Sequence, residues 1–531
     1  MPALRNEDLS FDTPFWLTID IRQYPHVCFA RMVTRDSPYM TWREYHELTK
    51  HSVESLRRTQ HYLDWTKMPN PFRHYEGVPI LDLPADPPAP QISALEVLEG
   101  KPGNTSAMDG AGFLSQLMFY SASISASKRV PSTGYTYALR VNPSSGNLHP
   151  TEFHFSTRGL VDWSDGLYHY RPSSHMAEQR AIGDIGRKLV DTSAPLVFVL
   201  TSIAWREAWK YQNRAYRYCL HDIGHAWQSL ALAARSLGCE SFALGNFSDD
   251  KVAELCHLSG DEWPMLIVGL HGPSIPVRVL NQVDMTLFGG EPNRLTEEEL
   301  PYPLIEKVHA VTKLSTEAII PSLGPPKASG RGQISLPPHV SASRGFGDVV
   351  RTRRSALDFK GGDGSISLSQ LAPLLSSTKE PLFADFATTR FVQLYLYVHR
   401  VEGLARGVYR YWPEHAELEI IKQGDQRLVA AALSLGQDLA GNACLAFSMI
   451  GDFENAARSY GDRGYRYVHF EAGAIGQRMY LASEALGLRA TGIGAFFDEE
   501  VNRYLSLSPE LGQVVYHFAI GYSVPDPRLE G

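Results

Sequence analysis

The sequence predicts an α+β protein made of two similar halves, and a long internal repeat is the main reason. Residues 211–258 and 460–507 align without a gap at a constant spacing of 249 residues, with 16 identities in 48 positions. In each copy, helical apolar spacing alternates with short apolar runs typical of strands. Two long repeats indicate duplicated domains and not a solenoid of short units.

Length and composition agree with a soluble globular protein of two or three domains. The 531 residues are 44% hydrophobic and 20% charged, with a net charge of −8, so neither nucleic acid nor an anionic membrane is expected as a partner. The five scattered cysteines form no CxxC pair and predict neither disulfides nor a metal site. The first residues contain no apolar signal core, so a cytoplasmic protein is expected.

The first half begins with a helical pattern over 41–65 and a second over 113–125. Alternating or continuous apolar runs then predict strands. These runs are 153–156, 166–174, 195–202 and 265–270. Between the last two, apolar residues from Cys219 to Leu237 recur at intervals of three and four, which predicts a long helix capped by Gly238.

The second half repeats this order. Its ISLSQLAPLL segment (366–375) predicts a helix, and a second helix is expected from Val468 to Leu486, capped by Gly487. Strands are expected at 392–400, 407–414, 444–451 and 514–521. We therefore expect an N-terminal extension (1–90), a first domain (91–280), a Pro/Gly/Ser-rich connector (281–345) and a second domain (346–531).

Three polar stretches stand out. One is the loop from Arg140 to Pro150, RVNPSSGNLHP; another is Arg353-Arg354-Ser355; the third is Lys210-Tyr211. Taken singly, each has a structural explanation: a turn before a strand, a solvated charge pair, and an exposed helix start.

Together and in this order, these stretches resemble the nitroreductase superfamily, and most closely its SagB-type dehydrogenases, which include azoline oxidases. The resemblance covers about 90–280 and 350–525, and it includes GLYxYxP and the KYxxRxYR and GHxxQ segments that follow. It implies two nitroreductase-like α/β sandwich domains, each a mostly antiparallel sheet flanked by helices, packed as an intramolecular pseudo-dimer.

The resemblance also implies FMN as cofactor, held by residues from both halves. Arginine forks suit a phosphate, and glycines let backbone amides approach a flat ring. The residues expected to bind FMN are Arg353, Arg354, Ser355, Arg140, Pro143, Ser144, Ser145, Gly146, Asn147, Gln437, Gly492, Ile493, Gly494 and Arg528. Lys210 is expected to remove a substrate proton with Tyr211 as its hydrogen-bond partner.

The two copies differ in a complementary way. Aligning FLSQL with SLSQL places Glu99 to Lys101 where the second half has Arg353 to Ser355, so the first half lacks the phosphate clamp. The second half lacks a Pro-Ser-Gly loop and has Ser459 where the first half has Lys210. If sites form across the interface, one site survives, and we expect one FMN per chain.

The predicted function is therefore an FMN-dependent dehydrogenase or oxidase acting on a peptide or small molecule, with NAD(P)H or O₂ as redox partner. Two alternatives stay open: an NAD(P)H-dependent nitro or quinone reductase, and a flavin-free scaffold that binds a peptide. His149 and Leu357 depart from the family pattern, which leaves the substrate undefined. The chain is expected to act as a monomeric pseudo-dimer.

Overall fold

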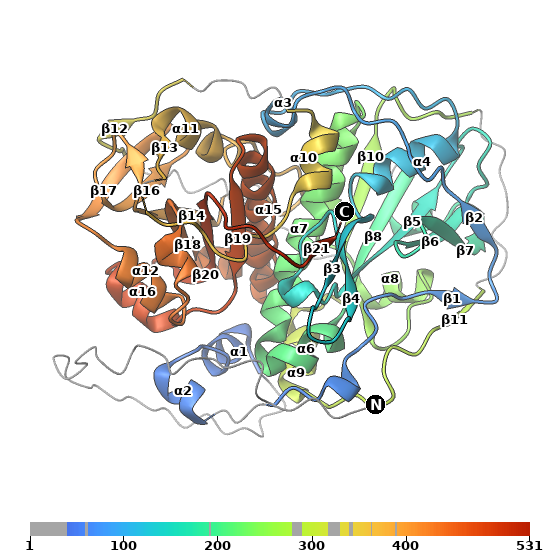
Figure 1. Cartoon of the computed structure of the whole chain (residues 1–531). Helices are drawn as coiled ribbons and strands as arrows, with labels where there is room; N and C mark the ends of the chain where they lie inside the picture. The colour runs from blue at the N-terminus through green and yellow to red at the C-terminus, as the bar shows by residue number, and fades with distance from the viewer. Residues whose placement is uncertain are drawn as a thin grey trace.

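The computed structural model describes residues 40–58, 62–190, 193–278, 289–316, 330–338, 344–362, 364–387 and 390–530. Two α+β halves lie side by side, and one long helix from each half packs along the other at the centre (Figure 1). These helices are α7 (Ala215–Ser236) and α15 (Gly464–Ala485). They begin at residues 249 positions apart, as the sequence repeat predicts. No helix in the described ranges is long and apolar enough to cross a membrane.

Each half contains a seven-stranded sheet in which every neighbouring pair is antiparallel. The first sheet has the order β2 (Ile80–Asp82), β7 (Met176–Ile182), β6 (Gly166–Arg171), β5 (Thr151–Thr157), β8 (Leu196–Ile203), β10 (Glu262–His271) and β9 (Glu240–Leu244). The second has the order β12 (Ile334–Ser335), β17 (Glu417–Gln423), β16 (Gly407–Trp412), β14 (Val392–Val398), β18 (Leu445–Gly451), β20 (Gln513–Gly521) and β19 (Arg489–Ile493). The identical order confirms the predicted fold class.

Helices cover both sheets in a matching order. Besides α7, the first half has α3 (Ala94–Leu98), α4 (Gly110–Phe119), α5 (Gly186–Leu189), α6 (Ala204–Tyr211) and α8 (Asp249–Leu255). Besides α15, the second has α10 (Phe346–Thr352), α11 (Leu368–Ser376), α12 (Arg427–Leu433), α13 (Leu439–Asn442), α14 (Phe453–Tyr460) and α16 (Asp498–Tyr504). Gly238 and Gly487 follow the central helices with φ of 79° and 74°, so both predicted glycine caps are present.

Two predicted helices are shorter in the structure. The 41–65 pattern gives α1 (Trp42–Leu48), α2 (Val53–Arg58) and the start of a 3₁₀ turn at Trp65–Lys67, because the Thr49 hydroxyl donates to the carbonyl of Tyr45 at the end of α1. The 113–125 pattern ends as a helix at Phe119, where Ser121 and Ser123 hydroxyls bond helix carbonyls, and a strand begins at Ile124.

Small sheets join parts of the chain that are distant in sequence. Strand β1 (Tyr75–Glu76) pairs with β11 (Glu291–Pro292), and β13 (Ile366–Ser367) pairs in parallel with β15 (Val401–Glu402). A three-stranded sheet pairs the β3–β4 hairpin of the first half with β21 at the C-terminus, in the order β21 (Leu529–Glu530), β3 (Ile124–Arg129), β4 (Thr136–Arg140). It lies between the two halves in Figure 1.

The central helices touch through glycine. A Cβ placed on Gly224 would lie 2.2 Å from the Phe470 carbonyl oxygen, and one on Gly473 would lie 2.1 Å from that of His221. Gly224 and Gly473 are equivalent in the repeat, so each half presents the same surface to the other. That reciprocity is the property of a two-fold interface, here formed within one chain.

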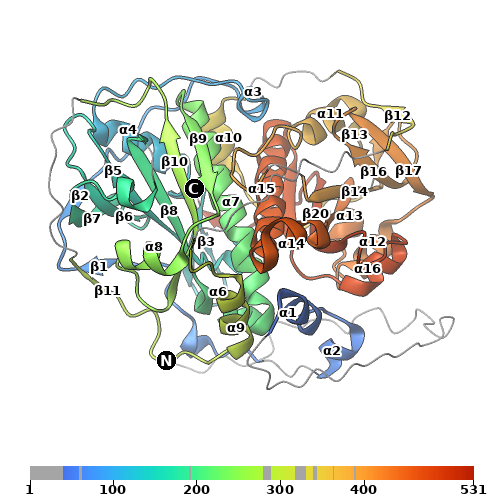
Figure 2. The ribbon, with the colours of Figure 1, turned by 180° about the vertical axis from the view of Figure 1, so that it is seen from behind.

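The helix that precedes each half packs across this interface, on the other half. In α1, Trp42 stacks on Phe453 and Tyr465 of the second half, at 5.3 and 5.7 Å between ring centroids. In α9 (Pro303–Thr312), His309 stacks on Trp263 of the first half at 3.9 Å. Figure 2 shows α1 beneath the second half and α9 beside α6 of the first. The helix α9 lies in the segment expected to be a connector, and it repeats the role of α1.

Candidate functional site

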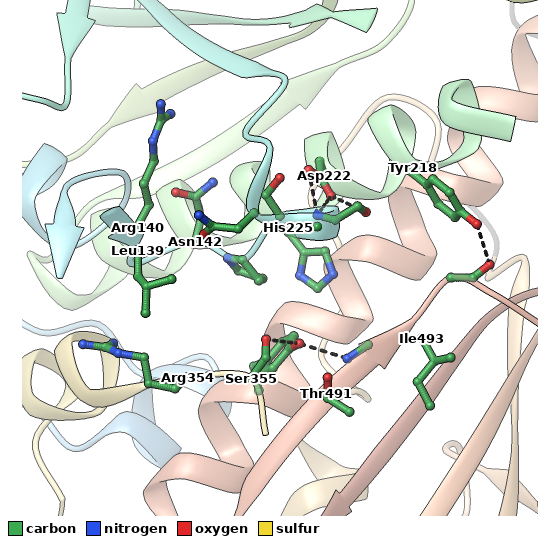
Figure 3. Close-up of a pocket in the computed structure, with 18 of the residues that line it drawn as sticks. Leu139, Arg140, Asn142, Tyr218, Asp222, His225, Arg354, Ser355, Thr491 and Ile493 are labelled. Carbon is green, nitrogen blue, oxygen red and sulfur yellow. Dashed lines mark hydrogen bonds between the residues drawn. The ribbon is translucent and has the colours of Figure 1, made fainter. Parts of the chain in front are cut away.

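A cavity of about 400 Å³ lies at the junction of the two halves and is lined by both. Figure 3 shows Asn142 and Asp222 of the first half facing Arg354, Ser355 and Thr491 of the second, whereas the Arg140 side chain points away from the second half and donates to the carbonyl of Pro71. Fourteen of the sixteen predicted site residues line it. They are Arg140, Pro143, Ser144, Ser145, Gly146, Asn147, Tyr211, Arg353, Arg354, Ser355, Gln437, Gly492, Ile493 and Gly494. The fold thus brings together residues that are more than 200 positions apart in the sequence.

The Pro-Ser-Ser-Gly loop forms one wall and is fixed by α7. Ser145 donates its backbone N–H and its hydroxyl to Asp222, both at 3.1 Å. Asn147 donates to the carbonyl of Ala138, and the Ser144 hydroxyl accepts the N–H of His149. The loop therefore keeps its shape through bonds to its own half.

Gly146 leaves room for the Lys-Tyr pair. Its φ is 58°, and a Cβ placed on it would lie 2.7 Å from Tyr211 Oη and 3.2 Å from Lys210 Nζ. Tyr211 lines the cavity, whereas Lys210, beside the same glycine, is outside the lining residues. Burial lowers the pKa of Lys210, which favours a neutral amine, and the nearby Glu207 opposes that effect.

Positive charge gathers at the end of the cavity formed by the RRS segment. Arg353 donates to the carbonyls of Val141 and Arg140, each at 3.0 Å, so this predicted phosphate ligand also joins the two halves. Arg354 donates to the Ser125 carbonyl at 3.0 Å. Burial, with the charges of Arg353 and other arginines, lowers the pKa of Arg354 to about 10.

These arginines have no carboxylate partner among the ion pairs of the described ranges, whereas Lys128 on the same cavity wall pairs with Asp526 at 2.8 Å. Guanidinium groups held in place without a counter-charge suit a phosphate. Arg528 does not line the cavity, because both of its bonds at 2.8 Å go to Asp526. Its predicted contact with the cofactor is thus not formed by the wall of this cavity.

Ser355 and the GIG segment are joined through a tyrosine. Tyr480 Oη lies 2.8 Å from the Ser355 hydroxyl and accepts the N–H of Gly492 at 2.9 Å. A Cβ on Gly492 would meet Tyr516 Oη at 2.0 Å, and one on Gly494 would meet the Tyr218 ring at 2.4 Å. The two glycines therefore let aromatic side chains reach the cavity wall.

Several cavity residues were not predicted from the sequence. They are Lys128, Tyr137, Leu139, Asn142, Tyr218, Asp222, His225, Tyr480, Thr491, Ala495 and Tyr516. Among them, His225 Nε2 and Tyr516 Oη form a 3.2 Å hydrogen bond between α7 and β20. Burial lowers the pKa of His225 to about 3, so this ring is neutral at physiological pH. Asp222 and His225 are recognisable in sequence only as polar positions on a largely buried helix.

Asp222 is a buried carboxyl that holds the Pro-Ser-Ser-Gly loop. It is 2% exposed, and burial raises its pKa to about 7, opposed by its bonds from the loop serines. Its counterpart Glu471 accepts the backbone N–H groups of Phe391 and Val392, both at 3.0 Å. An acid at this position thus anchors the chain just before a central strand in both halves.

The equivalent place on the other side of the interface is filled by the chain itself. Asp385 accepts the N–H groups of Gly245 and Asn246 at 2.8 and 3.0 Å, and Phe386 stacks on Tyr467 at 4.2 Å with an angle of 10°. Gly245 and Tyr467 are the counterparts of Gly494 and Tyr218. The side chains of Asp385 and Phe386 thus occupy the space that is open at the first site.

The segments after α3 and α10, which contain Lys101 and Arg353, can be aligned from the first residues of these two helices. Ser93 and Gly345, which precede α3 and α10, form a bridge to each other across the interface. This pairing places Lys101, and not Glu99, opposite Arg353. Lys101 is exposed and pairs with Glu96 at 3.2 Å. The first half therefore presents no clamp to the second site, although the physical reason is the outward direction of Lys101 and not a repulsive glutamate.

Comparisons with known proteins agree with this architecture. The Nitroreductase family model matches residues 134–272 and 350–522, more than half of the chain. A protein of Methanocaldococcus jannaschii described as a nitroreductase is 34% identical over 167 residues, which are 30% of this chain and 83% of that protein. A crystal structure from Anabaena variabilis, described as a nitroreductase, is 26% identical with a TM-score of 0.71 and covers 92% of this chain and all of its own. Another from Ralstonia eutropha is 18% identical, with a TM-score of 0.30, over 39% of this chain and 93% of its own.

Proposed function

This chain belongs to the nitroreductase family of oxidoreductases, and from that premise we propose that it is an FMN-dependent dehydrogenase or oxidase with one FMN between its two halves. The observation that carries the proposal is the cavity wall itself. The surviving arginine pair comes from one half, and the P-S-S-G loop and Tyr211 come from the other. The first family match also begins at residue 134, beyond the clamp segment, whereas the second includes Arg353 to Ser355.

The residues present fit an FMN. Arg354, which has no carboxylate partner, suits its phosphate, and Gly492 and Gly494 line the cavity. The Gln437 amide nitrogen already donates to the carbonyls of Ser434 and Ala495, which leaves its Oε1 to accept from a polar ring edge. When bound, FMN supplies hydride transfer at its N5 atom. The protein then has to hold the ring, exclude water and move one proton.

The proton route begins at Tyr211. Tyr211 lines the cavity, and both its hydroxyl and Lys210 Nζ lie beside Gly146. Burial lowers the pKa of the Lys210 amine, as a base at neutral pH requires. We assign proton removal from a peptide or small-molecule substrate to this pair, with Tyr211 nearer the substrate. This resembles the SagB-type enzymes.

Flavin content tests the proposal directly. Purified protein reconstituted with FMN should show the flavin visible spectrum with one FMN per chain. Arg354→Ala should lower FMN retention, whereas Lys101→Ala, in the corresponding segment of the first half, should leave it unchanged. A colourless protein that takes up no FMN would refute the enzyme assignment, and two FMN per chain would refute the single site.

A second activity has to be distinguished from the proposed one, namely the reduction of nitro or quinone compounds by NAD(P)H. Anaerobic mixing with NADPH distinguishes the two. Bleaching of the flavin within one turnover time would favour the reductase, and an unchanged flavin spectrum would favour oxidation of a substrate that supplies the hydride.

A further inference from the structure

Glu207 is a buried carboxyl for which the fold provides no hydrogen bond. It is 0% exposed on α6, one helical turn before Lys210, and within the described ranges neither carboxylate oxygen has a hydrogen-bond partner. Residues three apart on a helix face the same side, so the two side chains are neighbours. An isolated buried charge is strongly unfavourable, so Glu207 either holds a proton or has its charge compensated by a nearby group.

Lys210 is the one cation among the charged groups that act on Glu207. The titratable groups facing Glu207 are Lys210 and Tyr211 on its own helix and Cys219 and Asp222 on α7. Burial, with the charge of Asp222, raises the pKa of Glu207 well above its usual range, and Lys210 opposes that effect. Burial lowers the pKa of Lys210, and Glu207 opposes it in turn.

The second half supplies an internal comparison. Its equivalent helix α14 also has eight residues and ends at the equivalent tyrosine, Tyr460. Ala456 stands at the Glu207 position and is fully buried, and Ser459 stands at the Lys210 position. The carboxyl and the amine have therefore been lost together, on the side where Asp385 and Phe386 fill the site. The same helix forms without Glu207, so folding of this element does not require it.

We propose that Glu207 is a positioning residue for Lys210, a buried acid that compensates the charge of the amine from one helical turn away on α6. The proposal rests on the proposed function, in which Lys210 and Tyr211 remove a substrate proton. When a new N–H bond forms at Lys210 Nζ, the bond from that proton to its donor breaks, and the ammonium is one helical turn from the Glu207 carboxyl group. Glu207 itself touches neither substrate nor cofactor.

A double-mutant cycle tests the pair without a substrate. The variants are Glu207→Ala, Lys210→Ser and the double change, which gives α6 the residues found in α14. Each single change removes one partner and leaves the other without its compensating group, so the two single losses of stability should together exceed the loss in the double variant. If the two losses add instead, the pair is refuted.

A second readout separates a charge partner from a merely structural residue. Competitive labelling of Lys210 with acetic anhydride, followed by mass spectrometry, reports the neutral fraction of its amine. In FMN-loaded Glu207→Gln, loss of the carboxylate should lower the pKa of Lys210 and raise its labelling at pH 7, about tenfold for each pKa unit. Unchanged labelling would overturn the proposal.

The flavin spectrum of the same samples keeps the two proposals distinct. Coupling between Glu207 and Lys210 in a protein that takes up no FMN would refute the proposed function while supporting the pair. Normal FMN uptake with additive stability losses would refute the pair and leave the cofactor assignment standing.

Discussion

Asp498 and Asp249 are equivalent carboxylates, yet only one of them supports the open site. Asp498 accepts from Arg217 at 2.7 Å, from Arg214 at 3.0 Å and from the N–H of His51 at 2.9 Å. Asp249 accepts from Arg466 at 2.8 Å, from Arg463 at 2.7 Å and from the N–H of Leu314 at 2.9 Å. Asp498 is 2% and Asp249 1% exposed, so Asp→Asn at each isolates two buried guanidinium groups. We expect each variant to lose about 3–5 kcal/mol of unfolding free energy.

The two variants should differ in FMN binding. Arg214, held by Asp498, donates to the carbonyl of Gly494 at 3.3 Å, and Gly494 lines the open cavity. Arg463, held by Asp249, donates to Gly245, whose N–H is already taken by Asp385. A loss of about 1.4 kcal/mol from the support of Gly494 would weaken FMN binding roughly tenfold in Asp498→Asn. Asp249→Asn should bind FMN as the unaltered protein does.

Urea unfolding and FMN fluorescence titration on the same preparations measure both quantities. The pair of variants controls for general destabilisation, because the ion-pair geometry removed is the same. Equal weakening of FMN binding in both variants would refute a single open site. No weakening in Asp498→Asn would refute the role assigned to Arg214 and Gly494.

Three further experiments test other parts of the site. Folding raises the pKa of Asp222 from 3.8 to about 7, so between these pH values the folded state binds more protons than the unfolded state, and this group's contribution to stability falls as pH rises. Between pH 4 and pH 8, the unfolding free energy of the unaltered protein should drop by up to about 4 kcal/mol relative to Asp222→Asn, as measured by urea titration at each pH. Gly146→Ala and the control Gly134→Ala should each lower the unfolding free energy by about 1–2 kcal/mol, because both glycines have a left-handed φ. Only Gly146→Ala crowds Tyr211 and should weaken FMN binding, so equal FMN affinities in the two variants would show that this contact does not matter. Phe386→Ala removes a ring that is 2% exposed and should lower the unfolding free energy by about 3–5 kcal/mol, while FMN stays at one per chain. A second bound FMN, measured by absorbance, would show that the Phe386 ring alone closes the second site.

Much of the fold was predictable because its pattern is local. The apolar run 195–202 became β8, and the stripe from Cys219 became α7 with Gly238 beyond its end. The errors came from side chains that compete with the backbone: the Ser121 and Ser123 hydroxyls bond helix carbonyls and end α4 early. The spacing of apolar residues does not show where a side-chain hydroxyl will compete with the backbone for a hydrogen bond.

One repeat was present in the sequence and was missed. YHELTKHS at residues 45–52 and VHAVTKLS at 308–315 share His, Thr, Lys and Ser at the same positions. Their Thr49 and Thr312 carbonyls accept from Arg214 and Arg463 at equivalent bonds. The duplication therefore includes the extension helix. Comparing short segments at a second spacing, 263 residues, would have found it.

The sequence by itself determined the duplicated α+β fold and most of the cavity residues, because repeat, periodicity and the clamp and loop segments are written along the chain. The tertiary structure alone decided that α1 packs on the opposite half, that Tyr211 lines the cavity while Lys210 does not, and that Asp385 and Phe386 fill the second site. These outcomes depend on contacts between residues that are distant in sequence or on the direction of one side chain in a helix. Residue spacing carries no information about how closely two such surfaces meet.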